Sequence, residues 1–257
     1  MADQEDHWAF QPLQKPAIPS DLKNEWSINA VDLFTLQALG GAGLHPSPRA
    51  EPTTLLRRLT LDLTGLPPTL EELETYEFAV ASKGPDEAYL ELVERLLSSP
   101  HYGERWGRHW LDVGRYVQGK TKVAAVDRID MAEPYRDYVV RALNADKPFD
   151  QFVVEQIAGD IVAGNALESS SRNQLDLLAA PGFLSIGPWF ADCADPNTLR
   201  MDIIDEQIST TTQAFLGLNF ACARCHDHFF DPIPTRDYYA LAGIFGSTRI
   251  LKKNSSN

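Results

Sequence analysis

The residues with the clearest chemistry are two cysteines followed directly by a histidine. Cys222, Cys225 and His226 stand in the order C-x-x-C-H, which is the attachment signature of a c-type haem. Two thiols three positions apart on a helical turn can reach the two vinyl groups of one porphyrin edge, and the following imidazole can then ligate the iron. This segment predicts one covalently attached haem c, with His226 as its proximal ligand.

Two other kinds of site use the same side chains. A structural zinc ion takes four ligands, and the candidates are Cys222, Cys225, Cys193 and either His226 or His228. Such sites usually pair two cysteine knuckles, and the sequence holds one. A redox-active C-x-x-C is the third possibility, but the strand–helix–strand pattern that accompanies it is not evident. In the haem interpretation His228 cannot reach the same iron from the other side, so we expect it to bond the backbone or a propionate.

Other side chains could complete a haem site. The candidates for the second axial ligand are His101, His109, Met131, Met201 and Cys193. We favour His109, which lies in a predicted helix rich in aromatic and basic residues; a packed core histidine is the alternative. Arg105 and Arg108 on that helix could pair with haem propionates, because a guanidinium matches a carboxylate. An i,i+4 pair with Asp112 is the alternative for Arg108.

The rest of the chain must position these residues, and its apolar pattern is helical. Leucines at 55, 59, 63 and 66 recur at the spacing of one helix face, and Gly65 with Pro67-Pro68 ends that helix. Thr69 and Glu72 form a capping-box pattern, and Ser99-Pro100 opens a helix that should run to about Tyr116. Further apolar stripes predict helices near 89–97, 138–143, 152–157, 204–218 and 238–245.

No period-2 alternation extends beyond about four residues, so we predict an all-α fold. The expected organisation is an extended N-terminal strap over 1–26, a single helical haem domain over 27–250 and a disordered polar tail over 251–257. Long loops are expected within that domain, at 120–132 and 187–200.

Composition excludes several classes of protein. The 257 residues are 44% hydrophobic and 23% charged, which is ordinary for a globular protein. No apolar run is long enough to span a membrane. The net charge of −13 argues against a nucleic-acid surface and against docking on anionic lipid. Three cysteines make no disulfide framework, and no catalytic-triad, Walker, dinucleotide or H-E-x-x-H motif occurs.

The chain resembles the planctomycete-type cytochrome c-associated family, specifically the second conserved domain of those large exported proteins. The matching stretches are Arg57–Pro68, His101–Trp106, Arg108–Val113, Tyr135–Tyr138, Gln156 with Ala158–Asp160, Phe215–Leu218, Ala221–His228, Phe230–Pro234 and Asp237–Tyr239. The resemblance implies a periplasmic or cell-envelope location and an N-terminal cytochrome-like domain elsewhere in the parent protein. One departure is Phe229, where the family commonly has lysine.

A c-type haem is attached outside the cytoplasm, yet the acidic N-terminus does not read as a secretory signal, so we expect a piece of a longer exported protein. The first functional hypothesis is a mono-haem c-type domain for extracytoplasmic electron transfer. Its partner would be a redox protein with a basic surface, or the cytochrome domain of the same parent. The alternatives are a haem oxidoreductase with an open distal site and a zinc-stabilised interaction domain without catalysis.

Overall fold

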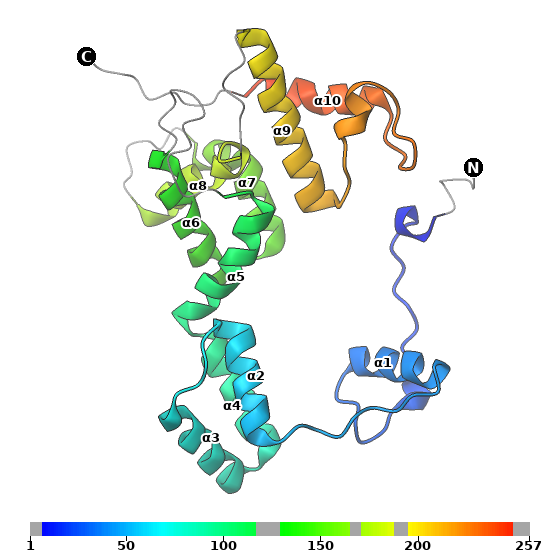
Figure 1. Ribbon diagram of the computed structural model, residues 1–257, viewed down its shortest axis with the longest axis vertical. Helices are drawn as coiled ribbons and strands as arrows, with labels where there is room; N and C mark the ends of the chain where they lie inside the picture. Colours follow the sequence, from blue (N-terminus) through cyan, green and yellow to red (C-terminus); the bar gives the residue numbers. More distant parts are fainter. Residues whose placement is uncertain (1–6, 117–128, 165–170, 188–194, 249–257) are drawn as a thin grey trace. The chain divides into compact units, whose positions relative to one another are not determined.

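A computed structural model describes residues 7–116, 129–164, 171–187 and 195–248. Within these ranges the regular structure is entirely helical and contains no strand (Figure 1), which confirms the predicted all-α class. None of the helices in these ranges combines the length and the apolar character needed to cross a bilayer. Cys193, the predicted tail and most of the predicted loop at 120–132 lie outside the described residues.

The chain divides into two compact units, 1–55 and 56–257. In the first, short 3₁₀ turns η2 (Trp8–Phe10) and η3 (Ser20–Leu22) precede helix α1 (Ala30–Gly41). A reciprocal capping box between Asn29 and Asp32 begins α1. The sequence pattern did not predict this helix, because its apolar residues are spread around the axis and form no stripe.

The second unit holds the remaining helices. They are α2 (Pro52–Thr64), which crosses the division, α3 (Leu70–Lys83), α4 (Pro85–Leu97), α5 (Pro100–Val113), α6 (Ile129–Asn144), α7 (Phe149–Ala163), α8 (Arg172–Ala179), η4 (Ala180–Leu184), α9 (Pro196–Leu216), η5 (Ala221–Arg224) and α10 (Thr235–Gly246). The expected loop at 187–200 is partly wrong, because α9 already begins at Pro196. Asp195 caps it by accepting the N–H groups of Asn197 and Thr198.

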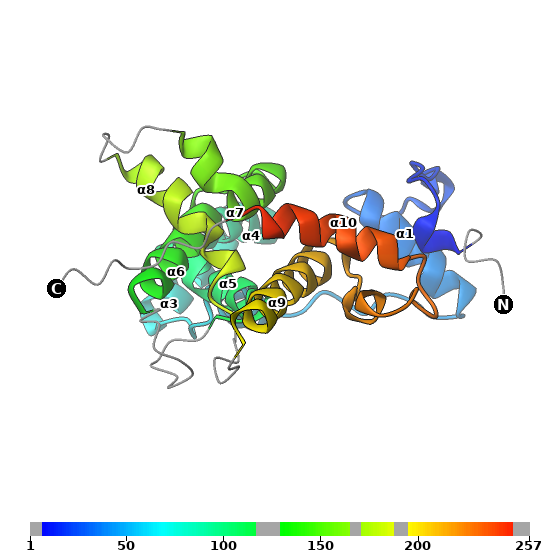
Figure 2. The same cartoon turned by 90° about the horizontal axis from the view of Figure 1, so that it is seen from above.

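Three apolar clusters form the core of this unit. The first joins α2, α3 and α4 around Leu56, Tyr76 and Leu92. The second joins α5 to α8 and η4 around Tyr135, Tyr138 and Phe183. The third, which concerns the cysteine motif, joins α9, η5 and α10 and contains Ile204, Ile208, Phe220, Ala223, Ile233, Tyr238, Ala242 and Phe245. The helix pairs α5–α6 and α9–α10 lie side by side in both views (Figure 1, Figure 2).

Helices α5 and α6 approach closely at Gly103. Its N–H donates to Asn144 Oδ1 at 2.7 Å, and Asn144 Nδ2 donates to the carbonyl of Pro100 at 3.0 Å. A Cβ built on Gly103 would lie 2.6 Å from Asn144 Cγ, closer than real Cβ contacts allow. The crossing therefore requires glycine at position 103 and the two hydrogen bonds that the Asn144 amide makes with α5.

A charged pair joins the end of α5 to α9. Arg115 lies just after α5 with a left-handed φ of 55° and donates to Glu206 on α9. Burial lowers the pKa of Arg115 to about 10, so the guanidinium is still charged at neutral pH. Both side chains are about three-quarters buried, with 29% and 25% exposed. This pair links the second and third clusters.

Replacing Glu206 with glutamine should lower the free energy of unfolding by about 2 kcal/mol, because it leaves a mostly buried guanidinium without a counter-charge. Urea unfolding followed by circular dichroism measures the change. The matched control is Asp112→Asn, which breaks the exposed Arg108–Asp112 pair and should change stability by about 0.5 kcal/mol or less. Equal changes in the free energy of unfolding would show that the buried Arg115–Glu206 pair stabilises the fold no more than the exposed Arg108–Asp112 pair does.

Candidate functional site

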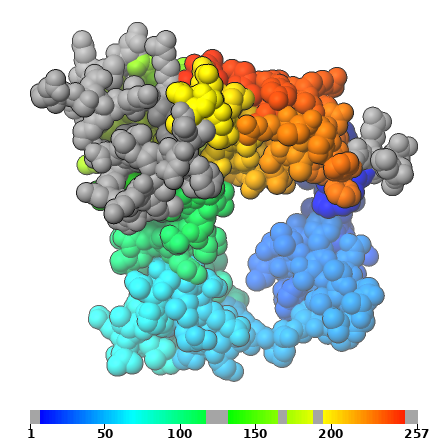
Figure 3. Space-filling model, turned by 45° about the horizontal axis from the view of Figure 1, so that its top comes forward, coloured from blue at the N-terminus to red at the C-terminus, as the bar shows by residue number. Residues whose placement is uncertain are grey.

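The cysteine motif lies on the short 3₁₀ turn η5 between α9 and α10. Phe220 and Ala223 are buried in the third cluster and hold one side of the turn against the core. η5 ends at Arg224 and Cys225 is its C-terminal cap. Because residues three apart eclipse on a 3₁₀ helix, we expect Cys222 and Cys225 to share one side of the turn. Both thiols are free and exposed. The segment that contains η5 is coloured orange in Figure 3. The turn thus presents two reduced cysteines together to solvent.

His226 follows the second thiol with its ring held by the backbone. Its Nδ1 lies 2.8 Å from the carbonyl oxygen of Asp227. A carbonyl can only accept, so Nδ1 is the donor and a neutral ring keeps its lone pair on Nε2. The side chain is exposed. Metal-ligating histidines commonly donate the other ring N–H to such a carbonyl, which fixes the tautomer, and His226 has this arrangement.

The residues after His226 shape the loop that leads into α10. His228 Nδ1 accepts the N–H groups of Phe230 at 3.3 Å and Asp231 at 2.9 Å. Asp227 Oδ1 accepts the N–H of Thr235 at 2.7 Å and so caps the start of α10. The expectation that His228 bonds the backbone is confirmed.

An electrostatic anchor holds the turn to α9. The guanidinium of Arg224 lies 3.4 Å from Asp202 and 3.6 Å from Asp205. Burial acts to lower the pKa of Arg224, but the charges of Asp205 and Asp202 outweigh it and the pKa is raised. The buried Tyr238 donates to Asp205 at 2.6 Å, and its pKa is raised by burial and by that bond. Tyr239 donates to the carbonyl of Arg224 at 3.0 Å.

Aromatic side chains are exposed beside the thiols. Phe229, Phe230 and Tyr239 are 72%, 81% and 51% exposed. The ring of Phe229 lies 4.7 Å from that of His226, centre to centre. Exposed apolar side chains gathered around a reactive motif indicate a surface that contacts something else.

The donor set fits a c-type haem. Attachment of a porphyrin edge uses two accessible thiols and an imidazole, and the described part of the chain supplies two exposed thiols and a His226 ring bonded only through Nδ1. Within the described ranges no group of three or more histidine, cysteine, aspartate or glutamate side chains is arranged to hold a metal ion. Cys193, one of the proposed zinc ligands, is outside those ranges.

The other predicted site residues lie on a different helix. Arg105, Arg108 and His109 are on α5, whose main partner is α6 in the second cluster, and all three side chains are exposed. Arg108 pairs with Asp112 at 2.8 Å, as the alternative for it predicted. The ring contact recorded for His109 is with Trp106. The described contacts do not bring these residues to the cysteine turn, and their roles toward haem stay predictions.

The remaining candidates for the second axial ligand are also placed only in part. His101 bonds Glu104 at 2.8 Å on α5, and Met201 on α9 packs against the third cluster. Cys193 and the side chain of Met131 lie outside the described residues. Sequence reasoning missed Asp202, Asp205 and Tyr238 as supports of the turn. The spacing of three between Asp202 and Asp205 indicated that they share one helix face, but nothing local in the sequence linked them to Arg224 or Tyr238.

Comparison with known proteins identifies a family. The model of the family PSCyt2, described as a protein of unknown function (DUF1549), matches residues 30–250. No curated protein and no solved structure matches the chain.

Proposed function

We propose, from the premise that this chain belongs to the PSCyt2 family, that it is a mono-haem c-type domain for electron transfer outside the cytoplasm. Cys222 and Cys225 would form the two thioether bonds and His226 would ligate the iron. The family name is consistent with an association with cytochromes, and the family's function is not defined by its description.

The observation that carries the proposal is the geometry of η5 and His226. Both thiols are exposed on one side of a 3₁₀ turn, and the Nδ1 bond to Asp227 leaves Nε2 of His226 free. Phe220, Ala223 and Ile233 supply the buried contacts of the turn, so the thiols take no part in its apolar core. The residues that face solvent are therefore available for attachment.

A bound haem would supply reversible one-electron chemistry at its iron. The chain's own residues would bind and orient it. The Asp227 carbonyl holds the imidazole of His226 by its Nδ1–H, so the other ring nitrogen, Nε2, would be the one to ligate the iron. Arg224, tied to Asp202 and Asp205, keeps the thiols at a constant position relative to α9. Phe229 lies against the ligating ring and would exclude water from one side of it.

Location and partner follow from the same proposal. Covalent haem attachment occurs outside the cytoplasm, so the protein would work in the periplasm or cell envelope. A net charge of −13 favours a redox partner with a basic surface, because complementary charge speeds the encounter and selects the partner. The cytochrome domain expected in the same parent protein is the second candidate partner.

The direct test is to express the chain in a host with haem-maturation machinery and to record its mass and absorbance. We expect a mass increase of one haem and sharp α and β bands after reduction. A colourless protein of unmodified mass that holds stoichiometric zinc would overturn the proposal in favour of the zinc-stabilised domain. Rapid binding of carbon monoxide by a haem-bearing protein would instead indicate the oxidoreductase with an open distal position.

A further inference from the structure

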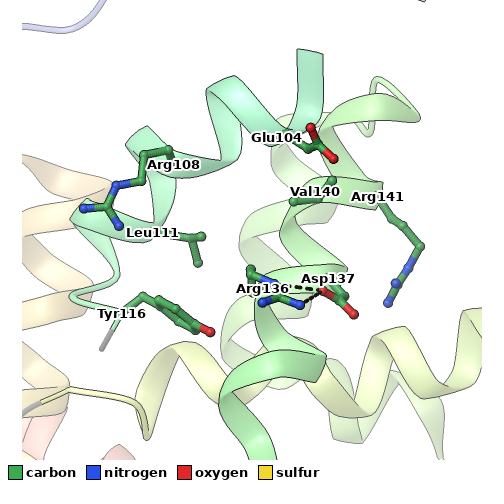
Figure 4. Close-up of a pocket in the computed structure, with 8 residues that line it drawn as sticks. All are labelled: Glu104, Arg108, Leu111, Tyr116, Arg136, Asp137, Val140 and Arg141. Carbon is green, nitrogen blue, oxygen red and sulfur yellow. Dashed lines mark hydrogen bonds and ion pairs between the residues drawn. The ribbon is translucent and has the colours of Figure 1, made fainter. Parts of the chain in front are cut away.

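A second feature, independent of the cysteine turn, is a pocket between the end of α5 and α6. Its volume is about 450 Å³, within the range of small-molecule sites. Its lining includes Arg108 and Leu111 on α5, Tyr116 on the turn that follows, and Arg136 and Val140 on α6 (Figure 4). Leu111 and Val140 give it an apolar floor. The pocket thus combines apolar surface with guanidinium groups.

The polar atom that distinguishes this pocket is the hydroxyl of Tyr116. It is buried and has no hydrogen-bond partner in the described part of the chain. Burial raises the pKa of Tyr116 and the nearby charge of Arg136 acts to lower it, so the hydroxyl is protonated at neutral pH and is a donor without an acceptor. Buried polar groups without partners are uncommon, and one that lines a pocket points to a missing acceptor.

The arginines differ in how firmly they are held. Arg141 is bound to both carboxylate oxygens of Asp176, so it is a fixed charge at the edge of the pocket. Arg136 donates from Nε and Nη2 to a single oxygen of Asp137, which leaves Nη1 outside its recorded bonds. Arg108 pairs with Asp112 where both side chains are about 60% exposed, at 63% and 59%, so that contact is weak and easily exchanged.

We propose that this pocket binds a small organic acid. The carboxylate would lie between Arg108 and Arg136 and accept the hydrogen of the Tyr116 hydroxyl, while an apolar body rests on Leu111 and Val140. The apolar floor favours an organic acid over an inorganic anion. Glu104 and Asp137 also line the pocket and would repel a second negative charge, which favours a monocarboxylate.

The test titrates the purified full chain with phenylacetate, phenylacetamide and inorganic phosphate by isothermal calorimetry. We expect saturable binding of phenylacetate, with the neutral amide and phosphate at least about tenfold weaker. Arg136→Gln and Arg108→Gln should each weaken phenylacetate binding about tenfold, because each removes a charge-assisted hydrogen bond. Arg57→Gln, which removes an exposed charge on α2, is the matched control and should leave binding unchanged.

Tyr116→Phe separates a binding role from a structural one. It should weaken phenylacetate binding about threefold or more while leaving the melting temperature unchanged or higher, since the hydroxyl makes no bond within the described chain. The Arg108 side chain is exposed, so its variant should fold even if that of Arg136 does not. Equal binding of phenylacetate and phenylacetamide, equal binding of phosphate, or full affinity in the Arg108 and Tyr116 variants would each overturn the proposal. No detectable binding of phenylacetate at about 10 mM would overturn it as well.

Discussion

The double variant Cys222→Ser/Cys225→Ser is expected to carry no covalently attached haem, whereas the unaltered chain gains the mass of one haem under the same expression conditions. Both thioether bonds require a thiol, and the proposed site contains these two. Each single variant keeps one of the two exposed thiols. It should therefore retain one thioether bond and yield a less uniform product. Mass spectrometry of the denatured protein measures the covalent increment directly.

The matched control for the thiols is Cys193→Ser, which removes the third cysteine and should leave the covalent increment intact. His226→Ala should keep haem attached but lose the absorbance spectrum of the unaltered protein, because the covalent bonds and the iron ligand belong to different side chains. An unchanged spectrum in His226→Ala would show that another residue ligates the iron. Haem retained by the double serine variant would refute covalent attachment at this turn.

Gly103→Ala is expected to destabilise the fold by about 3 kcal/mol. The added methyl group would collide with the backbone carbonyl of Val140 and with the side chain of Asn144, whose amide is already committed to Gly103 and Pro100. A backbone atom cannot rotate away, so α5 and α6 must separate, and overpacking of this kind commonly costs about 1–3 kcal/mol or more. Thermal and urea unfolding of the variant measure the loss.

The control for this substitution is Gly40→Ala on α1, where a new Cβ would meet nothing within 4 Å. That change should be neutral or slightly stabilising, because alanine favours the helix more than glycine does. If Gly103→Ala proves as mild as the control, then α5 and α6 do not cross as closely as described.

Local signals in the sequence predicted much of the fold. Thr69 and Glu72 make both halves of the expected capping box, and Ser99 caps α5 with Pro100 at its first position. Gly65 follows the end of α2 with a left-handed φ of 72°. These features depend on residues within four positions of one another, so the sequence order alone displays them.

The predictions that failed concern which face of a helix is buried, and this is set by residues far away in the sequence. The predicted stripe on α2 is partly right, because Leu59 and Leu63 pack against the first cluster. The fully buried residues are instead Leu56 and Thr60, and Leu66 lies beyond the helix and is exposed. Trp106 on α5 is large and aromatic, yet it is 41% exposed. Both depend on which neighbouring helix covers a given face, and spacing along the chain does not encode that choice.

In the candidate site too, the features that are local in sequence were predicted and the contacts from other helices were not. The motif at Cys222 to His226 is local, and its exposure on one turn agrees with what attachment needs. Asp205 supports that turn from a separate helix and could not be assigned from spacing to Arg224 or Tyr238. The choice of α5 as the helix that completes a haem site rested on composition, and the described contacts give it no added support.

The way the helices pair has a consequence for how the protein folds. The principal helix–helix contacts join α3 with α4, α5 with α6, α7 with α8 and α9 with α10, so most partners are close in sequence. Helices that follow one another in the chain cost less closure entropy to bring together than distant ones, and local pairing of this kind favours rapid folding. Among the described residues, the turn that bears the thiols makes its principal contacts with α9 and α10. It can therefore present Cys222 and Cys225 as soon as those two helices have met, without waiting for the first or second cluster to assemble.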